Sequence, residues 1–483
     1  MLFCLMNAVL VSTFAVPATL NADITDPPLP RITTSDGMFV VADTGEPFIP
    51  RGFQYVRIRN NGAHYVHTPG FYQPLAVEEM FADLAEHRFN IVRTFLGLDG
   101  LFDETGISEA FLDNLEDFLR RARRHGIYVI LERRYVLPVG AYGRALADWE
   151  SHFTQGIVPG PNNMRYMSKA YSKAMALFWS DLVQAIKTRD PDLLSTVFAY
   201  ELENESEFRV NESPIVDTSG TFYAPDGKAF DVSDEDTLQA LLDHCTILWA
   251  NAAVAAIQKV DPSAMVSASV FTYRASGRPD GPGKPRSATA SDPRYPLRPV
   301  ALAQSDLSYV DIHLYPESID ALDVHLENIE FARLQEICNK TGKPIFVGEF
   351  GALKPFFPDF TPAYEMVKNV IPRLFEQGFA GYCYWTYDCH EQPYVWNAKA
   401  EAGQIFQFLA DFNHGDIAVN NSRGGVSSFW ACSHERFKVH DGTAGQRHNR
   451  AILRHSKMCR SSDCTECLFN MSGNRIHRHN TLQ

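Results

Sequence analysis

Residues 196–205, TVFAYELENE, join an apolar run to three glutamates. Val197, Phe198 and Leu202 are typical of a parallel strand buried on both faces. Similar runs occur near 48–55, 89–95, 127–132, 264–271, 308–315, 344–349 and 379–387. Between them, apolar residues recur at helical spacing in 108–125, 168–188, 236–259, 320–340 and 362–377. The alternation predicts a closed (β/α)₈ barrel, the TIM barrel. An open doubly wound sheet is the alternative, but no glycine-rich phosphate loop follows the first strand.

The length of 483 residues leaves room for long insertions, because a barrel of this kind needs roughly 250 residues. We expect one catalytic domain over 23–414. Its longest connections, 133–166, 206–235 and 272–300, leave the carboxyl ends of strands, where barrel enzymes build their sites. The third connection is rich in arginine, proline and glycine, and is predicted either as a solvated loop or as a wall of the cleft. The net charge of −14 argues against nucleic acid or an anionic membrane as partner.

The two ends of the chain differ from this domain. Residues 1–22 form an apolar run without acidic residues and are predicted to be a signal peptide, so we expect secretion to the exterior or the periplasm. A buried N-terminal segment is the alternative. The tail, 415–483, is basic and rich in His and Cys, and is predicted to be disordered. Its possible zinc ligands fit no zinc motif, so we expect no metal. No later stretch is predicted to span a membrane.

Nine cysteines show no disulfide framework. Cys383 and Cys389 lie near the end of a predicted strand and could form a disulfide. The other cysteines of the barrel are predicted to be free buried thiols. We expect a monomer without a cofactor.

Two segments place carboxylates at the ends of predicted strands. In the first, an extended chain would put Glu201, Glu203 and Glu205 on one face. Their mutual repulsion would raise some of their pKa values unless arginines lie nearby, and a general acid needs a raised pKa. In the second segment, 344–351 (PIFVGEFG), a short apolar run ends in Glu349. Gly348 and Gly351 flank this carboxylate, and such small neighbours would let a substrate approach closely. Two such carboxylates are what cleavage of a glycosidic bond requires.

Over residues 46–413 the chain resembles glycoside hydrolase family 5 and its clan of retaining barrel glycosidases, which includes endoglucanases and endo-β-mannanases. The pieces that carry the resemblance are RGFQY (51–55), NIVR (90–93), YELENE (200–205), DIHLY (311–315), VGEFG (347–351) and GYCYW (381–385). The resemblance implies a retaining hydrolase that cleaves a β-linked polysaccharide, either β-1,4-glucan or β-mannan, by double displacement.

The resemblance also implies roles for single residues. Glu205 would be the acid/base and Glu349 the nucleophile, with their carboxyls ~5–5.5 Å apart, as retaining enzymes require. Asn204 would hydrogen-bond the sugar 2-hydroxyl. Arg93 would pair with Glu349, lower its pKa and keep it ionised at neutral pH.

Three more residues would line the same site. Tyr315 would hydrogen-bond the nucleophile, His313 would help to set the protonation of the acid/base, and Trp385 would form the floor of the subsite for the cleaved sugar. Structural roles are the alternatives: Arg93 could be an ion-pair partner inside the barrel, His313 a core histidine with satisfied hydrogen bonds, and Trp385 part of the core packing. The chain departs from the family at 131–135 (LERRY), where a His is common, and at Ser206, where Pro is usual.

Two other functions compete with hydrolysis. A barrel that binds carbohydrate but has lost turnover would keep the same residues. A metal-dependent lyase or racemase would need acidic ligands on successive strands. The ends of the third and fifth strands supply Glu132 and then Thr272-Tyr273, and this set does not make a metal site.

Overall fold

The computed structural model describes residues 26–59, 62–133, 136–149, 153, 155–286 and 292–414. The predicted signal peptide, 1–22, and the predicted tail, 415–483, lie outside the described residues, as do Arg134 and Tyr135.

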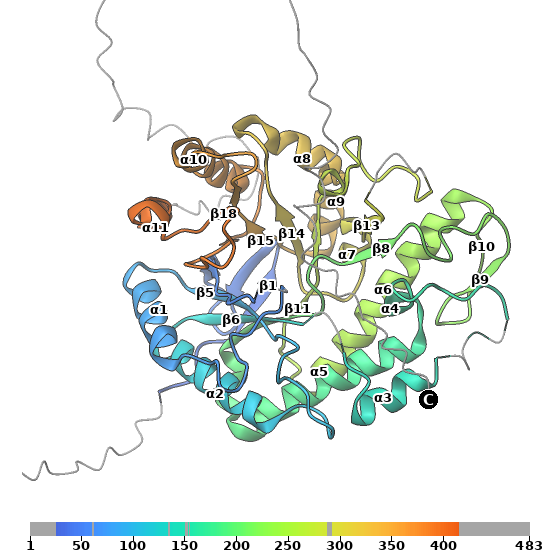
Figure 1. Cartoon of the computed structure of the whole chain (residues 1–483), viewed down its shortest axis with the longest axis horizontal. Helices are drawn as coiled ribbons and strands as arrows, with labels where there is room; N and C mark the ends of the chain where they lie inside the picture. Colours follow the sequence, from blue (N-terminus) through green and yellow to red (C-terminus); the bar gives the residue numbers. More distant parts are fainter. Residues whose placement is uncertain are drawn as a thin grey trace, which may run out of the picture.

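The described residues form a (β/α)₈ barrel (Figure 1). All eight predicted strands are present, and every pairing between them is parallel. They are β4 (Arg51–Gln54), β5 (Ile91–Phe95), β6 (Tyr128–Glu132), β7 (Val197–Glu201), β11 (Val266–Ser267), β12 (Ser269–Phe271), β14 (Val310–Leu314), β15 (Ile345–Phe350) and β17 (Tyr382–Tyr384). The fifth barrel strand is divided at Ala268 into β11, which pairs with β7, and β12, which pairs with β14. This divided strand therefore closes the ring.

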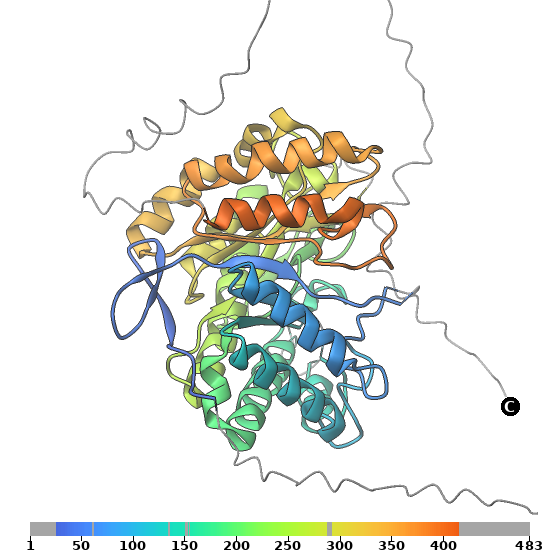
Figure 2. The same cartoon turned by 90° about the vertical axis from the view of Figure 1, so that its left-hand side faces the viewer.

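Helices surround the barrel, and neighbours such as α10 and α11 pack against each other (Figure 2). They are α1 (Pro74–Glu86), α2 (Glu109–Arg124), α5 (Lys169–Arg189), α6 (Glu235–Val260), α7 (Pro299–Gln304), α8 (Leu322–Asn328), α9 (Phe331–Thr341), α10 (Phe360–Glu376) and α11 (Ala400–His414). The prediction of one helix over 320–340 is wrong. Glu330 adopts a left-handed conformation (φ 56°), which a helix interior does not tolerate, and separates α8 from α9.

Helix α6 is long and apolar enough to cross a membrane, judged by length and composition alone. The sequence predicted a helix over 236–259 but no membrane span there. In the fold it packs against α5 and buries Leu238, Leu242 and Trp249, as the core helix of a barrel does. Packing within the domain therefore accounts for its apolar composition.

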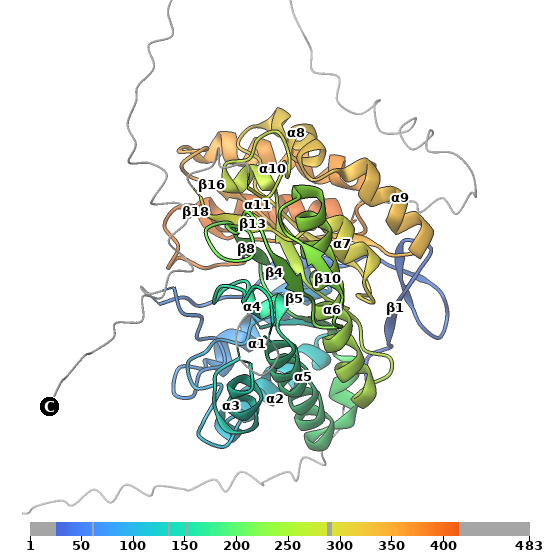
Figure 3. The same cartoon turned by 90° about the vertical axis from the view of Figure 1, so that its right-hand side faces the viewer.

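A three-stranded antiparallel sheet, which the sequence analysis did not predict, covers the amino-terminal end of the barrel. It consists of β1 (Ile32–Ser35), β2 (Met38–Val41) and β3 (Pro47–Phe48). The ring of Phe39 lies 5.1 Å from that of Phe198 and 5.2 Å from that of Tyr309, and closes this end with aromatic contacts. Figure 3 shows β1 on the side of the barrel away from β16 (Ala352–Leu353) and β18 (Val395–Trp396). The open end is therefore the carboxyl end of the strands.

The long connections at the carboxyl end contain short helices and strands of their own. They contain α3 (Gly140–Ala147) and α4 (Met164–Met167), then β8 (Glu207–Arg209), β9 (Thr221–Tyr223) and β10 (Ala229–Asp231), and finally β13 (Arg294–Pro296). Strand β13 pairs with β8, so the second and third connections support each other. Arg286 adds a bond from Nε to the carbonyl of Ile215 at 2.8 Å. The described part of 272–300 is thus packed against the second connection and is not a solvated loop.

The possible disulfide between Cys383 and Cys389 does not form. Both thiols are free and buried, as are Cys245 and Cys338. Cys383 packs with Phe346 in the cluster that contains Phe39, whereas Cys389 packs with Val395 in a different cluster that contains Trp385.

Candidate active site

Glu349 lies inside strand β15, and its carboxylate is held from two sides. Arg93 Nη1 donates to its Oε1 at 2.7 Å, and the Tyr315 hydroxyl donates to its Oε2 at 2.7 Å. The glycine before it was expected to admit a substrate, but that expectation is wrong. A Cβ at Gly348 would lie 2.1 Å from Asp311 Oδ1, so the glycine makes room for a buried protein carboxylate.

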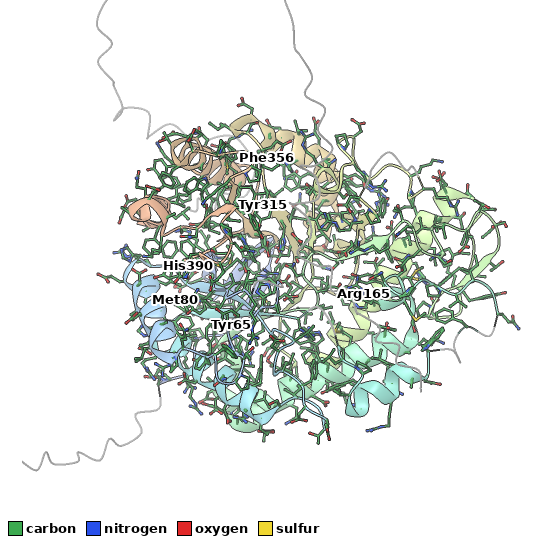
Figure 4. All side chains as sticks on the ribbon, viewed as in Figure 1. Tyr65, Met80, Arg165, Tyr315, Phe356 and His390 are labelled. Carbon is green, nitrogen blue, oxygen red and sulfur yellow. The ribbon has the colours of Figure 1, made fainter. Side chains whose placement is uncertain are left out.

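The glutamate that ends β7, Glu201, and the two that follow it, Glu203 and Glu205, do not share one face, contrary to the prediction. The strand ends at Glu201, and the regular alternation ends with it. Glu201 binds Arg93 inside the barrel, whereas Glu203 binds Arg165. Arg165 belongs to α4, and Figure 4 shows it well apart from Tyr315. The arginine partners that mutual repulsion required are therefore present.

Arg93 connects the two halves of the site. Its side chain is fully buried, and Nε and Nη2 donate to Glu201 at 2.5 and 2.6 Å. Nη2 also donates to Asn204 Oδ1 at 2.8 Å, while Nη1 reaches Glu349. One guanidinium thus fixes the distance between the segment that carries Glu205 and strand β15.

His313 bridges the two predicted catalytic glutamates. Its Nδ1 lies 3.3 Å from Glu205 Oε1 and 3.5 Å from Glu349 Oε2. Burial lowers the pKa of His313, but the charge of Glu349 and the bond to Glu205 outweigh burial and raise this pKa to about 9. The imidazole is therefore a cation at neutral pH.

The pKa of Glu349 departs from the prediction. Burial is the largest influence and raises this pKa above its ordinary value. Arg93 lowers it, as expected, and so does His313, while Glu205 raises it. Arg93 therefore acts as expected, but burial outweighs it, because the sequence did not reveal how completely the carboxylate is desolvated.

The carboxylates of Glu205 and Glu349 face each other. Their nearest oxygens and His313 Nδ1 all lie within 4.8 Å of one another. A second group of this kind joins Glu201, Asp311 and His313.

Trp385 lies at the same end of the barrel and is held edge-on to Phe95, with ring centroids 5.9 Å apart. Its indole Nε1 donates to Gln392 Oε1 at 2.7 Å, and the side chain is almost wholly buried. The structure therefore brings all seven predicted site residues to one end of the barrel.

Sequence reasoning missed three supporting side chains. Gln54 Oε1 accepts from Arg93 at 3.0 Å, Glu132 Oε1 accepts from the Asn204 N–H at 2.9 Å, and Ser269 Oγ accepts from the Glu205 N–H at 2.9 Å. Burial and the nearby Glu201 raise the pKa of Glu132 to about 8. The sequence signal that could have identified them is a polar residue inside an apolar strand or at its end.

Ser206 stands where Pro is usual in the family. It donates its N–H to Ser269 O at 2.9 Å, a bond that Pro could not make.

Comparisons with known proteins identify the family of the chain. A family model described as Cellulase (glycosyl hydrolase family 5) matches residues 42–390. Among solved structures, an endo-1,4-beta-mannanase from Rhizomucor miehei is 14% identical, with 79% of this chain and 99% of that chain covered and a TM-score of 0.51. A hyperthermostable endo-1,4-beta-D-mannanase from Thermotoga petrophila RKU-1 is 13% identical, with 76% and 99% covered and a TM-score of 0.49. A comparison with curated proteins found no match. At 14% identity the Rhizomucor miehei structure shows the barrel fold alone.

Proposed function

Because the chain belongs to glycosyl hydrolase family 5 and is a glycosidase, we propose that it cleaves a β-linked polysaccharide with retention of anomeric configuration. Glu349 is the nucleophile and Glu205 the acid/base. The observation that carries the proposal is the approach of their carboxylate oxygens to within 4.8 Å. Retaining enzymes hold these groups ~5–5.5 Å apart, whereas inverting enzymes need ~6.5–9.5 Å to admit a water molecule.

In the first step, Glu349 attacks the anomeric carbon and the bond to the leaving oxygen breaks. Arg93 and Tyr315 each hold one carboxylate oxygen of Glu349 and so keep its orientation. Glu205 donates its proton to the leaving oxygen and becomes a carboxylate, which the His313 cation stabilises at 3.3 Å. The products are a glycosyl ester on Glu349 and a shortened chain with a free hydroxyl.

In the second step, Glu205 takes a proton from water, and the resulting hydroxide attacks the anomeric carbon. The ester bond breaks, Glu349 is released as a carboxylate, and Glu205 is again protonated. Asn204 Oδ1 is bound to Arg93, so the amide nitrogen is the atom left to donate to a sugar hydroxyl. Trp385 forms the floor of the subsite for the cleaved sugar and stacks its apolar ring on the sugar face. Export directed by residues 1–22 would bring the protein to a polymer too large to enter a cell.

The anomeric configuration of the first product tests the proposal. Glucan and mannan oligosaccharides are hydrolysed in an NMR tube, and a β-anomer formed before mutarotation is expected. A 2-deoxy-2-fluoro glycoside of the hydrolysed sugar should label the peptide that contains Glu349, as read by mass spectrometry. Glu203→Gln is the matched control, because Glu203 lies in the Glu205 segment but faces Arg165, and it should keep the label. An α-anomer would refute retention, and binding without hydrolysis would identify a carbohydrate-binding barrel.

A further inference from the structure

The segment that carries Glu205 is out of register with the strand beside it. The carbonyls of Ser267 and Ser269, in the fifth barrel strand, accept from the N–H groups of Leu202 at 2.8 Å and Ser206 at 2.9 Å. The two acceptors are separated by one residue, but the two donors are separated by three. The Glu205 segment therefore bulges out of the ladder, as strands often do beside active sites.

Side chains replace the ladder for the residues in the bulge. The Glu205 N–H donates to Ser269 Oγ at 2.9 Å, and the Asn204 N–H donates to Glu132 Oε1 at 2.9 Å. Ser269 and Glu132 are 0% and 2% exposed. A buried N–H group without a hydrogen-bond partner would destabilise the fold. Ser269 and Glu132 therefore supply the two acceptors that the strand ladder does not provide in the bulge.

The Ser269 hydroxyl is itself fixed in direction. It can donate to Glu203 O at 3.3 Å, while the Ser269 N–H donates to the same carbonyl at 3.2 Å. With its hydrogen directed to Glu203, the hydroxyl presents a lone pair to the Glu205 N–H.

Glu205 adopts a backbone conformation that a residue with a side chain disfavours. Its φ of 50° lies in the left-handed region, where Cβ crowds the following carbonyl. Such conformations persist only where the surroundings fix them. If φ relaxed, the side chain would swing away from His313 and from Glu349.

We propose that Ser269, assisted by Glu132, is a positioning residue that holds Glu205 in the conformation from which it can protonate the leaving group. This inference rests on the proposed acid/base role of Glu205. Ser269 does not touch the reacting atoms and acts only through the backbone of Glu205.

Leaving-group dependence tests the proposal. Ser269→Ala is compared with Ser267→Ala, the same change in the same divided strand at a residue whose hydroxyl does not bind the Glu205 segment. For an oligosaccharide, whose leaving group needs a proton, kcat/KM of Ser269→Ala should fall about 10- to 100-fold. For the 2,4-dinitrophenyl glycoside of the same sugar, whose leaving group needs none, the change should stay within about threefold. Ser267→Ala should resemble the wild type on both substrates.

Amide hydrogen exchange gives a second readout that does not depend on catalysis. The peptide containing Glu205 should exchange faster in Ser269→Ala and at the wild-type rate in Ser267→Ala. Equal losses on both substrates, or unchanged exchange, would overturn the inference. Glu205→Ala separates the two proposals. If it lacks leaving-group dependence, the acid/base assignment is wrong. If it shows that dependence and Ser269→Ala does not, only the positioning role is wrong.

Discussion

The two carboxylates of the site are held in opposite ways. Glu349 lies within the regular strand β15, its side chain is 5% exposed, and Arg93 and Tyr315 bind its two oxygens. Glu205 follows the end of β7 in a bulge, has a φ of 50°, and its side chain is 26% exposed. One group is fixed by strand and arginine, and the other by side chains that hold an irregular backbone.

This difference matches the chemistry proposed for each group. A nucleophile must stay in line with the anomeric carbon, and it need not exchange protons with water. An acid/base must lose and regain a proton in every cycle, so partial exposure serves it. The barrel supplies a rigid position inside a strand and a more accessible position just beyond one.

Replacing each carboxylate by alanine gives the strongest contrast. Glu349→Ala should lower kcat by at least about 10⁵-fold, because no covalent intermediate can form. Glu205→Ala should lower it by about 10²- to 10⁴-fold, the range for loss of a general acid/base. Azide should restore turnover in both, yielding the α-glycosyl azide with Glu349→Ala and the β-glycosyl azide with Glu205→Ala, as read by NMR. The opposite pair of anomers would reverse the two assignments.

Arg93 supports one side of the comparison, and its removal should cost stability as well as activity. Arg93→Met leaves the buried Glu201 without its cation, removes one of the two cations beside Glu349, and should lower the free energy of unfolding by about 3–5 kcal/mol. It should also raise the pKa of Glu349 further, so the acidic limb of kcat/KM should move to higher pH. Urea unfolding and a pH profile measure the two effects.

Arg165→Met is the matched control for Arg93. Arg165 pairs with the buried Glu203 and does not contact Glu349, so its loss should reduce stability without moving the acidic limb. If both variants leave the limb unchanged, Arg93 has a structural role alone.

The barrel itself could be predicted from the sequence, because parallel strands are buried on both faces and appear as apolar runs. Two features of the fold were predicted wrongly or missed, because the spacing of apolar residues does not encode them. The helix over 320–340 is broken by a left-handed conformation at Glu330, a residue that gives no such signal. The sheet β1–β3 was missed because its strands are short and its aromatic partners come from distant strands.

The residues of the site could be located, but not the way they are held. The period-two rule failed after Glu201 because the rule assumes a ladder that the bulge interrupts. Position 348 needs a glycine because the Asp311 carboxylate would collide with any side chain there. Asp311 lies on another strand, and only the pairing of β14 with β15 brings it close. The raised pKa of Glu349 depends on burial, which is a property of the whole barrel.

His313 contacts both carboxylates, so its charge should affect stability within a defined pH range. Its pKa is about 9 in the folded protein against an ordinary value of 6.5. Because folding raises this pKa, the stabilisation from the charge is fully present below pH 6.5 and is lost as the pH rises to 9. The stability advantage of the wild type over His313→Gln should therefore shrink by about 3 kcal/mol between pH 6 and pH 9.5, as measured by urea unfolding.

His325→Gln provides the control for this pH dependence. His325 is also buried and binds a carboxylate, that of Glu317, but burial lowers its pKa and leaves it neutral over the same range. Its variant should show no such decrease between pH 6.5 and 9. A difference for His313→Gln that stays constant with pH would mean that the imidazole is neutral in the fold. In that case His313 would link the partly exposed carboxylate of Glu205 to the buried carboxylate of Glu349 as a neutral hydrogen-bonding group, and not as a cation that both share.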